Sequence, residues 1–114
     1  ERGVPRAVAT SAARHDVEGL LTRAGLRARF EIVVAAEDVR RGKPDPEVYL
    51  LAARRLGVAP ERCLVFEDAV VGVQAARSAG MRTIGVSTAH TETELRAAGA
   101  ERAVENFEGV SWPA

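Results

Sequence analysis

Five polar residues in this sequence have side chains that suit chemistry on a phosphate group. They stand just after short apolar runs or inside a proline-rich turn: Thr10, Ser11, Lys43, Glu67 and Asp68. Hydroxyl groups and an ammonium group can hold phosphoryl oxygens, and adjacent carboxylates supply the hard oxygen ligands that Mg²⁺ prefers. These residue types together point to phosphate binding assisted by a divalent cation.

Lys43 is set apart by the composition of the chain. There are 16 basic residues, and Lys43 is the only lysine among them. Pro44 and Pro46 restrict the backbone of its loop, so we expect the side chain to point in a limited range of directions. A compact ammonium suits a phosphate group as a point-charge partner. The alternative is an ordinary solvated lysine on an exposed turn.

Thr10 and Ser11 stand where a predicted strand passes into a predicted helix. A hydroxyl at such a position commonly caps the helix by accepting a hydrogen bond from a backbone amide of the first turn. The alternative is that the hydroxyl binds an anion together with the amides of the helix start. The residues alone leave both interpretations open.

Glu67 and Asp68 directly follow the apolar run 63–66. Carboxylates at the end of a buried strand are costly unless they are paired or bind a metal, and Mg²⁺ usually takes one or two carboxylates with several waters. Asp68 has an alternative role as the cap of the next helix. Gly72, in the first turn of that helix, either allows a backbone or a ligand to approach closely or is neutral.

The elements that must position these residues alternate along the chain. Short β-branched runs predict strands at 6–9, 30–35, 63–66, 82–86 and 103–104. Apolar residues at helical spacing predict helices over 14–24, 46–56, 70–79 and 91–98. Strands that alternate with helices predict an α/β fold, a Rossmann-like three-layer α/β/α arrangement with a parallel sheet. In such a sheet, ligands bind beyond the carboxyl ends of the strands, where the five polar residues stand.

Local signals set the ends of these helices. Gly25, Gly57 and Gly80 are predicted stops, and Thr91 with Glu94 forms a predicted capping box at the start of the last helix. The aromatic side chains after the last strand, Phe107 and Trp112, are expected to anchor the C-terminal tail.

Composition limits the classes of protein that remain. A length of 114 residues suits one domain, and 16 Lys and Arg against 16 Asp and Glu argue against a nucleic-acid or membrane-surface partner. No apolar run approaches the roughly 18–20 residues of a membrane span, and no secretory signal is visible. Cys63 stands alone, so no internal disulfide is expected. We therefore expect a cytoplasmic protein.

Three segments carry a resemblance to a known family. They are Ala-Val-Ala-Thr-Ser at 7–11, Gly-Lys-Pro-Asp-Pro-Glu-Val-Tyr at 42–49 and Phe-Glu-Asp-Ala-Val-Val-Gly-Val-Gln-Ala-Ala at 66–76. In this order they resemble the haloacid dehalogenase (HAD) superfamily of phosphatases and phosphomutases. The similarity is greatest to the branch with β-phosphoglucomutase-like and phosphoglycolate-phosphatase-like enzymes, and it covers nearly the whole chain.

The resemblance implies a role for each of the five polar residues. Thr10 matches the hydroxyl that hydrogen-bonds the transferring phosphoryl group, with Ser11 as its rival for that position. Lys43 matches the lysine that stabilises charge on the phosphoryl oxygens and on the nucleophile. Asp68 matches the Mg²⁺ carboxylate, and Glu67 matches the neighbouring acid that also contacts the metal. Such a division of labour fits phosphoryl transfer, which depends mainly on positioning and electrostatic stabilisation.

The sequence also departs from the family pattern. Members carry an Asp-x-Asp segment on a central strand, which the resemblance would place between the strands that end at Thr10 and Asp68. The four aspartates of this chain, Asp16, Asp38, Asp45 and Asp68, include no pair separated by one residue. We therefore expect residues 1–114 to form the C-terminal part of a HAD-like core domain. The missing strand would come from an N-terminal segment. The alternative is that a second copy of the chain pairs with the open strand edges.

Two function classes remain from the sequence. The first is part of an Mg²⁺-dependent phosphatase or phosphomutase that acts on a small phosphorylated metabolite such as a sugar phosphate, inactive without the Asp-x-Asp segment. The second is a non-catalytic HAD-like module that binds a phosphorylated ligand or a protein partner. Arg14, just inside the first helix, is a candidate contact for a distal phosphate.

Overall fold

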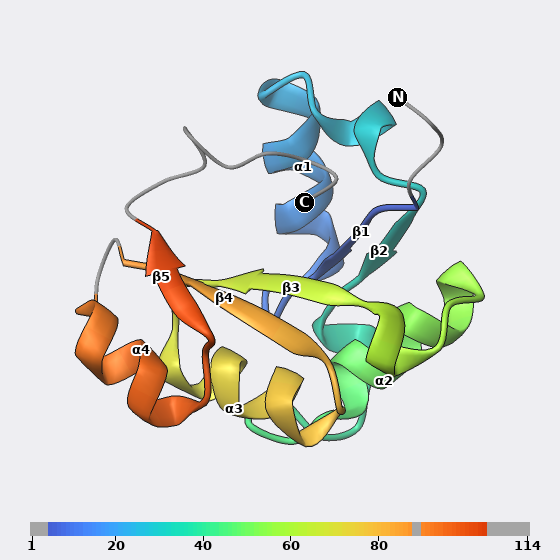
Figure 1. Cartoon of the computed structure of the whole chain (residues 1–114). Helices are drawn as coiled ribbons and strands as arrows, with labels where there is room; N and C mark the ends of the chain where they lie inside the picture. Colours follow the sequence, from blue (N-terminus) through green and yellow to red (C-terminus); the bar gives the residue numbers. More distant parts are fainter. Residues whose placement is uncertain (1–4, 88–89, 105–114) are drawn as a thin grey trace.

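The computed structural model describes residues 5–87 and 90–104 (Figure 1). The strands are β1 (Ala7–Ala9), β2 (Ile32–Val34), β3 (Leu64–Glu67), β4 (Arg82–Val86) and β5 (Arg102–Val104). The α-helices are α1 (Arg14–Arg23), α2 (Glu47–Leu56), α3 (Val70–Ser78) and α4 (Glu92–Ala98). Three short 3₁₀ helices, η1 (Arg27–Arg29), η2 (Ala36–Asp38) and η3 (Pro60–Arg62), lie in the connections.

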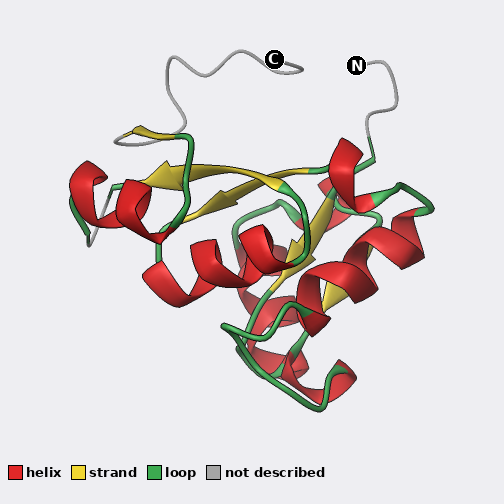
Figure 2. Ribbon diagram, turned by 60° about the horizontal axis from the view of Figure 1, so that its bottom comes forward, coloured by secondary structure: helices red, strands yellow, loops and turns green. Residues whose placement is uncertain are grey.

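Helices cover both faces of the β1–β2 pair, whereas α3 and α4 pack on one face of the sheet of β3, β4 and β5 (Figures 1 and 2). Strand β2 shows how: Val33 packs with α1 on one face, whereas Ile32 and Val34 pack with α2 on the other. Successive side chains of a strand point to opposite faces, so an uninterrupted apolar strand must be buried on both sides. The largest cluster of buried side chains lies between β2, α2 and α3, and a further cluster lies between α3 and α4.

All strand pairs are parallel, but the strands form two sheets. Strand β1 pairs with β2, with Val8 opposite Val33, while β4 lies between β3 and β5, with Phe66 opposite Ile84. In residues 5–87 and 90–104, no strand lies between β1 and β3. A groove of about 1060 Å³ occupies that place, and we call it the inter-sheet groove. Its walls are the residues of β1 and β3, and its floor comes from α2.

The predicted fold class and the order of its elements are confirmed. The predicted stop at Gly57 is confirmed because this residue ends α2 with a φ of 74°, a left-handed conformation that glycine adopts without steric cost. Thr91 and Glu94 form the predicted capping box of α4, with the Glu94 amide donating to the Thr91 hydroxyl over 3.1 Å. Phe107 and Trp112 lie outside the described residues.

Two capping alternatives are wrong. Helix α1 begins after Ala13, not after Thr10 or Ser11, and no side chain caps it. Helix α3 begins after Ala69, and Asp68 gives it no capping hydrogen bond. Thr10, Ser11 and Asp68 therefore stand two to four positions before the first residue of the helix, in the turns at the carboxyl ends of β1 and β3.

No helix within the described part of the chain combines the length and apolar character needed to cross a membrane.

Candidate functional site

Lys43 lies between the carboxyl ends of the two sheets. Its ammonium group Nζ donates to the Oε1 atom of Glu67, at the end of β3, over 3.0 Å, and to the backbone oxygen of Ala9, at the end of β1, over 3.4 Å. The Lys43 and Glu67 side chains are each only 10% exposed. One buried ammonium therefore connects the two sheets at the edge where ligands of α/β proteins bind.

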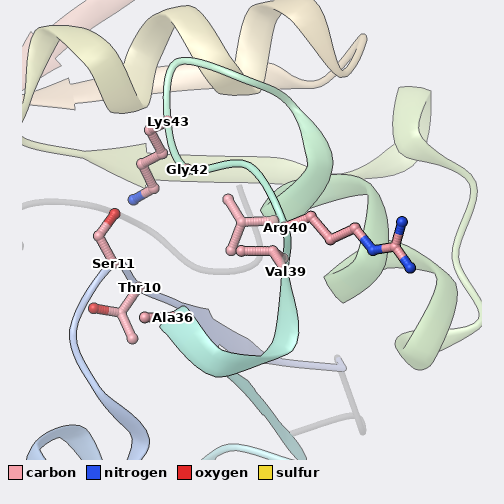
Figure 3. Close-up of a pocket in the computed structure, with 8 residues that line it drawn as sticks. Thr10, Ser11, Ala36, Val39, Arg40, Gly42 and Lys43 are labelled. Atoms are coloured by element: carbon pink, nitrogen blue, oxygen red, sulfur yellow. The ribbon is translucent and has the colours of Figure 1, made fainter.

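A pocket of about 190 Å³ opens beside this ammonium (Figure 3). Its walls include Thr10, Ser11 and Lys43, and the loop at Val39–Gly42 closes another side. Figure 3 shows the Lys43 ammonium and the Ser11 hydroxyl pointing toward each other, whereas the guanidinium of Arg40 points away. The structure thus brings three of the five polar residues together around one small cavity.

Two hydrogen bonds hold Thr10 in this pocket, one through its backbone amide and one through its hydroxyl. Its amide donates to the oxygen of Val34 over 2.9 Å, which extends the pairing of β1 with β2 by one residue. Its hydroxyl oxygen accepts from the amide of Ala12 over 3.0 Å. Because that bond uses a lone pair, the hydroxyl keeps its own proton for donation to another acceptor. Ser11 is exposed to solvent.

Glu67 has a donor for each of its carboxylate oxygens. Oε1 accepts from Lys43 and from the hydroxyl of Tyr49, and Oε2 accepts from the amide of Ala69 over 3.1 Å. Burial alone would raise the pKa of this carboxyl. The Tyr49 hydrogen bond, the charge and hydrogen bond of Lys43 and the Ala69 amide outweigh burial and hold the pKa below its usual value. Glu67 is therefore an ionised carboxylate inside the fold.

Gly72 explains why the Glu67 side chain can lie where it does. A Cβ atom on Gly72 would stand 2.0 Å from Cδ and 2.3 Å from Oε1 of Glu67. The group that approaches the first turn of α3 at Gly72 is thus the Glu67 carboxylate, neither a backbone nor a ligand.

Asp68 differs from Glu67 in its surroundings, because its side chain is exposed at the end of β3. An exposed carboxylate in that position fits Mg²⁺, which binds proteins through one or two carboxylates and completes its shell with water and phosphate oxygens. Glu67 fits a metal less well in this arrangement because donors already occupy both oxygens. Within the described residues, no three His, Cys, Asp or Glu side chains gather into a metal cluster.

Arg14 does not lie free for a distal phosphate. Its guanidinium donates to the carboxylates of Asp38 and Glu18 and, over 2.9 Å, to the backbone oxygen of Val33. Its own amide donates to Glu37 over 2.8 Å. In this structure Arg14 therefore ties α1 to β2 and η2.

Sequence reasoning missed the part that Tyr49 plays. The tyrosine belongs to a segment that carries the family resemblance, but no role was assigned to it. A signal was present: Tyr49 is the single tyrosine of the chain and stands on the apolar face of a predicted helix. A hydroxyl buried on such a face needs a polar partner, which the sequence could not identify.

The α/β fold, with a pocket at the carboxyl ends of its strands, agrees with a comparison to known families. The model of the haloacid dehalogenase-like hydrolases matches residues 1–80. The chain belongs to this family.

Relatives agree with this membership. The chain is 50% identical over 82 residues to fructose-1-phosphate phosphatase YqaB of Escherichia coli, which is 72% of this chain and 44% of that protein. It is 40% identical over 110 residues to validoxylamine A 7'-phosphate phosphatase of Streptomyces hygroscopicus subsp. limoneus, which is 96% of this chain and 51% of that protein.

Solved structures share the fold as well. The structure of CbbY from Rhodobacter sphaeroides in complex with phosphate superposes with a TM-score of 0.84 at 36% identity, over 96% of this chain and 49% of that one. A candidate β-phosphoglucomutase from Thermotoga maritima gives a TM-score of 0.82 at 41% identity, over 89% of this chain and 47% of that one. The chain thus spans about half the length of these relatives.

Proposed function

We propose that residues 1–114 are the C-terminal part of the core domain of an Mg²⁺-dependent phosphatase or phosphomutase. The observation that carries this proposal is the position of the Lys43 ammonium. It lies between the carboxyl ends of β1 and β3, next to the hydroxyls of the small pocket. A fixed cation beside hydroxyl donors in a cavity of this size suits a phosphoryl group.

A small phosphorylated metabolite, such as a sugar phosphate, is the proposed substrate class. Relatives in support include a fructose-1-phosphate phosphatase and a phosphorylated carbohydrates phosphatase of Thermotoga maritima, which is 46% identical over 78 residues. The CbbY protein has also been solved with xylulose-(1,5)bisphosphate. These names share a phosphate ester on a polyhydroxylated carbon chain.

The chain's own residues would bind and orient the phosphoryl group. The Thr10 hydroxyl, whose oxygen already accepts from Ala12, donates its proton to a phosphoryl oxygen. The Lys43 ammonium lies beside the phosphoryl oxygens and offsets their negative charge. Ser11 adds a hydroxyl donor on the solvent side of the pocket. Fixed donors of this kind need no reorganisation as charge develops in the transition state.

Asp68 would hold the Mg²⁺ ion, which supplies charge neutralisation for the phosphoryl oxygens when it is bound. Glu67 would act on the site chiefly through Lys43, because its oxygens already accept from Lys43, Tyr49 and Ala69.

The nucleophile would come from a segment that completes the sheet. The inter-sheet groove is open between two parallel strands, is lined mainly by apolar side chains, and ends at Lys43 and Glu67. A parallel strand that pairs with both β1 and β3 would bring its carboxyl end to the lysine. An Asp-x-Asp pair at that end would meet the phosphoryl pocket.

Catalysis tests this proposal directly. The purified chain with Mg²⁺ should not hydrolyse p-nitrophenyl phosphate, and the longer enzyme that includes the Asp-x-Asp segment should. In that enzyme, Lys43→Arg should lower kcat by about 100-fold or more, the loss typical of one misplaced donor to a transition state. Arg96→Lys, on the exposed surface of α4, is the matched control. Turnover by the 114-residue chain, or full activity of Lys43→Arg, would contradict the proposal.

Cys63 reports on the groove, because it lines the groove and is the only cysteine. A peptide of about five apolar residues followed by Asp-x-Asp should slow alkylation of this thiol by iodoacetamide. The same peptide with a central proline, which removes a ladder amide, is the control. Protection that instead rises with protein concentration alone would assign the groove to a second copy of the chain.

The non-catalytic module is the competing outcome. It draws on the same pocket, because Thr10, Ser11 and Lys43 could bind a phosphate group without a nucleophile. Phosphate binding with no turnover, in the chain and in the longer protein alike, would support it. The cytoplasmic location stays a prediction, which fractionation of the source cells would test.

A further inference from the structure

Tyr49 contacts both members of the ion pair at the site. Its hydroxyl donates to Oε1 of Glu67, the same oxygen that accepts from the ammonium of Lys43. The ammonium also stands 5.1 Å from the centre of the Tyr49 ring, within the range of a cation–π contact. One aromatic side chain therefore touches the anion through its hydroxyl and the cation through its ring.

The ring alone explains the packing of Tyr49 but not its hydroxyl. Tyr49 is 6% exposed and packs on the buried face of α2 with Ala52 and Ala53, where a phenylalanine would fill the same apolar space. A buried hydroxyl is unfavourable unless it has a partner, and here its partner is Glu67. Burial, and then the negative charge of Glu67, raise the pKa of Tyr49 far above its usual value, so the phenol stays a proton donor.

The Glu67 carboxylate is fixed from three sides. The Tyr49 hydroxyl donates to Oε1 from one side, and the Ala69 amide donates to Oε2 over 3.1 Å. On the third side lies Gly72, which is so close that a Cβ atom on it would collide with the carboxylate. Oε1 therefore has a defined position at the end of β3.

That position matters because lysine is flexible. The side chain of Lys43 has four rotatable bonds, and its ammonium is located by two acceptors, Oε1 of Glu67 and the backbone oxygen of Ala9. The Ala9 oxygen is part of the backbone, whereas Oε1 depends on a side chain. Displacement of Oε1 would move the ammonium away from the hydroxyls of the pocket.

We propose that Tyr49 is a positioning residue, whose hydroxyl holds the Glu67 carboxylate so that the Lys43 ammonium faces the Thr10 and Ser11 pocket. The proposal rests on the proposed function for the meaning of that orientation, but the contact itself is testable without any substrate.

The single lysine makes the test specific. Chain prepared with ¹⁵N-lysine gives one side-chain ammonium signal by NMR, that of Lys43. Tyr49→Phe should raise the rate at which these ammonium protons exchange with water by about five- to tenfold, the size expected for the loss of one hydrogen bond of ordinary strength. Leu51→Ala, which weakens packing on the same helix without touching Glu67, is the control and should change this rate less than twofold. An unchanged rate in Tyr49→Phe, or an equal rise in Leu51→Ala, would overturn the proposal.

Inorganic phosphate separates this proposal from the proposed function. We expect phosphate to shift the Lys43 signal in the wild-type chain and to bind Tyr49→Phe about five- to tenfold more weakly. No response in the wild type would count against the proposed function, while the exchange rates would still decide the role of Tyr49. Equal phosphate affinity in the two chains would overturn the positioning role.

If Tyr49→Phe does not fold, Glu67→Gln tests the same contact from the other side. This change keeps the shape of the side chain and removes its charge, so it should accelerate exchange of the Lys43 protons by at least the same factor. An exchange rate that does not change in Glu67→Gln would show that Lys43 is positioned without the Tyr49–Glu67 contact.

Discussion

Two of the ion pairs at the carboxyl ends of the strands differ in the capacity that their cation keeps for a further anion. Lys43 pairs with Glu67 between the two sheets, and both side chains are 10% exposed. Arg14 pairs with Asp38 beside the two-stranded sheet, and these side chains are 38% and 18% exposed. The first pair borders the pocket lined by Thr10 and Ser11, whereas the second joins α1 to η2.

The choice of cation accounts for much of this difference. The guanidinium of Arg14 is a planar fork whose donors reach Glu18, Asp38 and the Val33 oxygen. An ammonium has three protons, and the described residues supply Glu67 and the Ala9 oxygen as acceptors for two of them. Arg14 is thus suited to fastening elements together, and Lys43 retains capacity for an outside anion. The predictions that follow test this contrast on the 114-residue chain.

The largest expected effect is that of Lys43→Met. This change leaves the buried Glu67 carboxylate without its cation, so it should lower the free energy of unfolding by about 3–5 kcal/mol. Arg14→Met should cost about 1–2 kcal/mol, because its partners reach solvent more easily. Urea unfolding followed by circular dichroism gives both values. Equal losses in the two variants would remove the distinction between the pairs.

Gly72→Ala should come next in size. The new Cβ would overlap the Glu67 carboxylate, and overpacking of this kind costs about 1–3 kcal/mol. Gly42→Ala is the matched control, because a Cβ there meets nothing within 4 Å and should change stability by less than about 0.5 kcal/mol. The same urea experiment measures both. A neutral Gly72→Ala would mean that the carboxylate is free to move.

Asp38→Asn should lower the free energy of unfolding by about 1–2 kcal/mol. The Asp38 carboxylate accepts from the Ala35 amide over 2.8 Å and from Arg14, and charged acceptors form the stronger hydrogen bonds. A stability matched to wild type would show that Arg14 finds other acceptors. Thermal unfolding, compared with Asp16→Asn on the exposed side of α1, provides the measurement and its control.

The pH dependence of stability should follow from the same residue. The Ala35 amide, and then Arg14, hold the pKa of Asp38 below its usual value of about 3.9. The folded chain therefore binds this proton more weakly than the unfolded chain. The stabilisation is complete above the usual pKa and is lost as the pH falls through the lower, folded value. Urea midpoints between pH 6 and pH 2 should fall less steeply in Asp38→Asn than in wild type, and parallel curves would contradict this assignment.

The smallest effect is expected for the surface pair of Arg82 and Glu101. Their bonds of 2.9 and 3.0 Å are well formed, but the side chains are 65% and 39% exposed. A double-mutant cycle should give only a small coupling free energy, which declines toward zero in 1 M NaCl. The coupling between Lys43 and Glu67 should persist in the same salt. A salt-sensitive Lys43–Glu67 coupling would place that pair in solvent.

The backbone plan of the molecule could be predicted from local sequence. Apolar runs and glycine stops located the strands and helices, because each signal concerns residues only a few positions apart. Of the two interpretations of Thr10 and Ser11, capping of α1 is wrong, since the turn after Ser11 continues to Ala13 before the helix begins. Helix starts depend on backbone angles that a serine or threonine favours but does not fix.

The site was predictable by residue type but not by contact. Lys43 stood out as the single lysine, and the structure does place it beside Thr10 and Ser11. Its ion pair with Glu67 and the hydrogen bond from Tyr49 span 24 and 18 positions of the chain. Contacts at such separations depend on how α2 packs against β3, which no local pattern encodes. Arg14 illustrates the converse, since its position suggested a ligand and its neighbours proved to be Asp38 and Glu18.

The lack of room for a Cβ atom at Gly72 limits which substitutions this sequence can accept. Because a Cβ at position 72 and the glutamate side chain at position 67 compete for the same volume, the two positions are not free to change independently. An alanine at 72 becomes acceptable only with a shorter or displaced side chain at 67, and either change would alter the anchor of Lys43. Glycine at 72 thus constrains which acid can stand five residues earlier. Among homologous sequences, the pair should vary together.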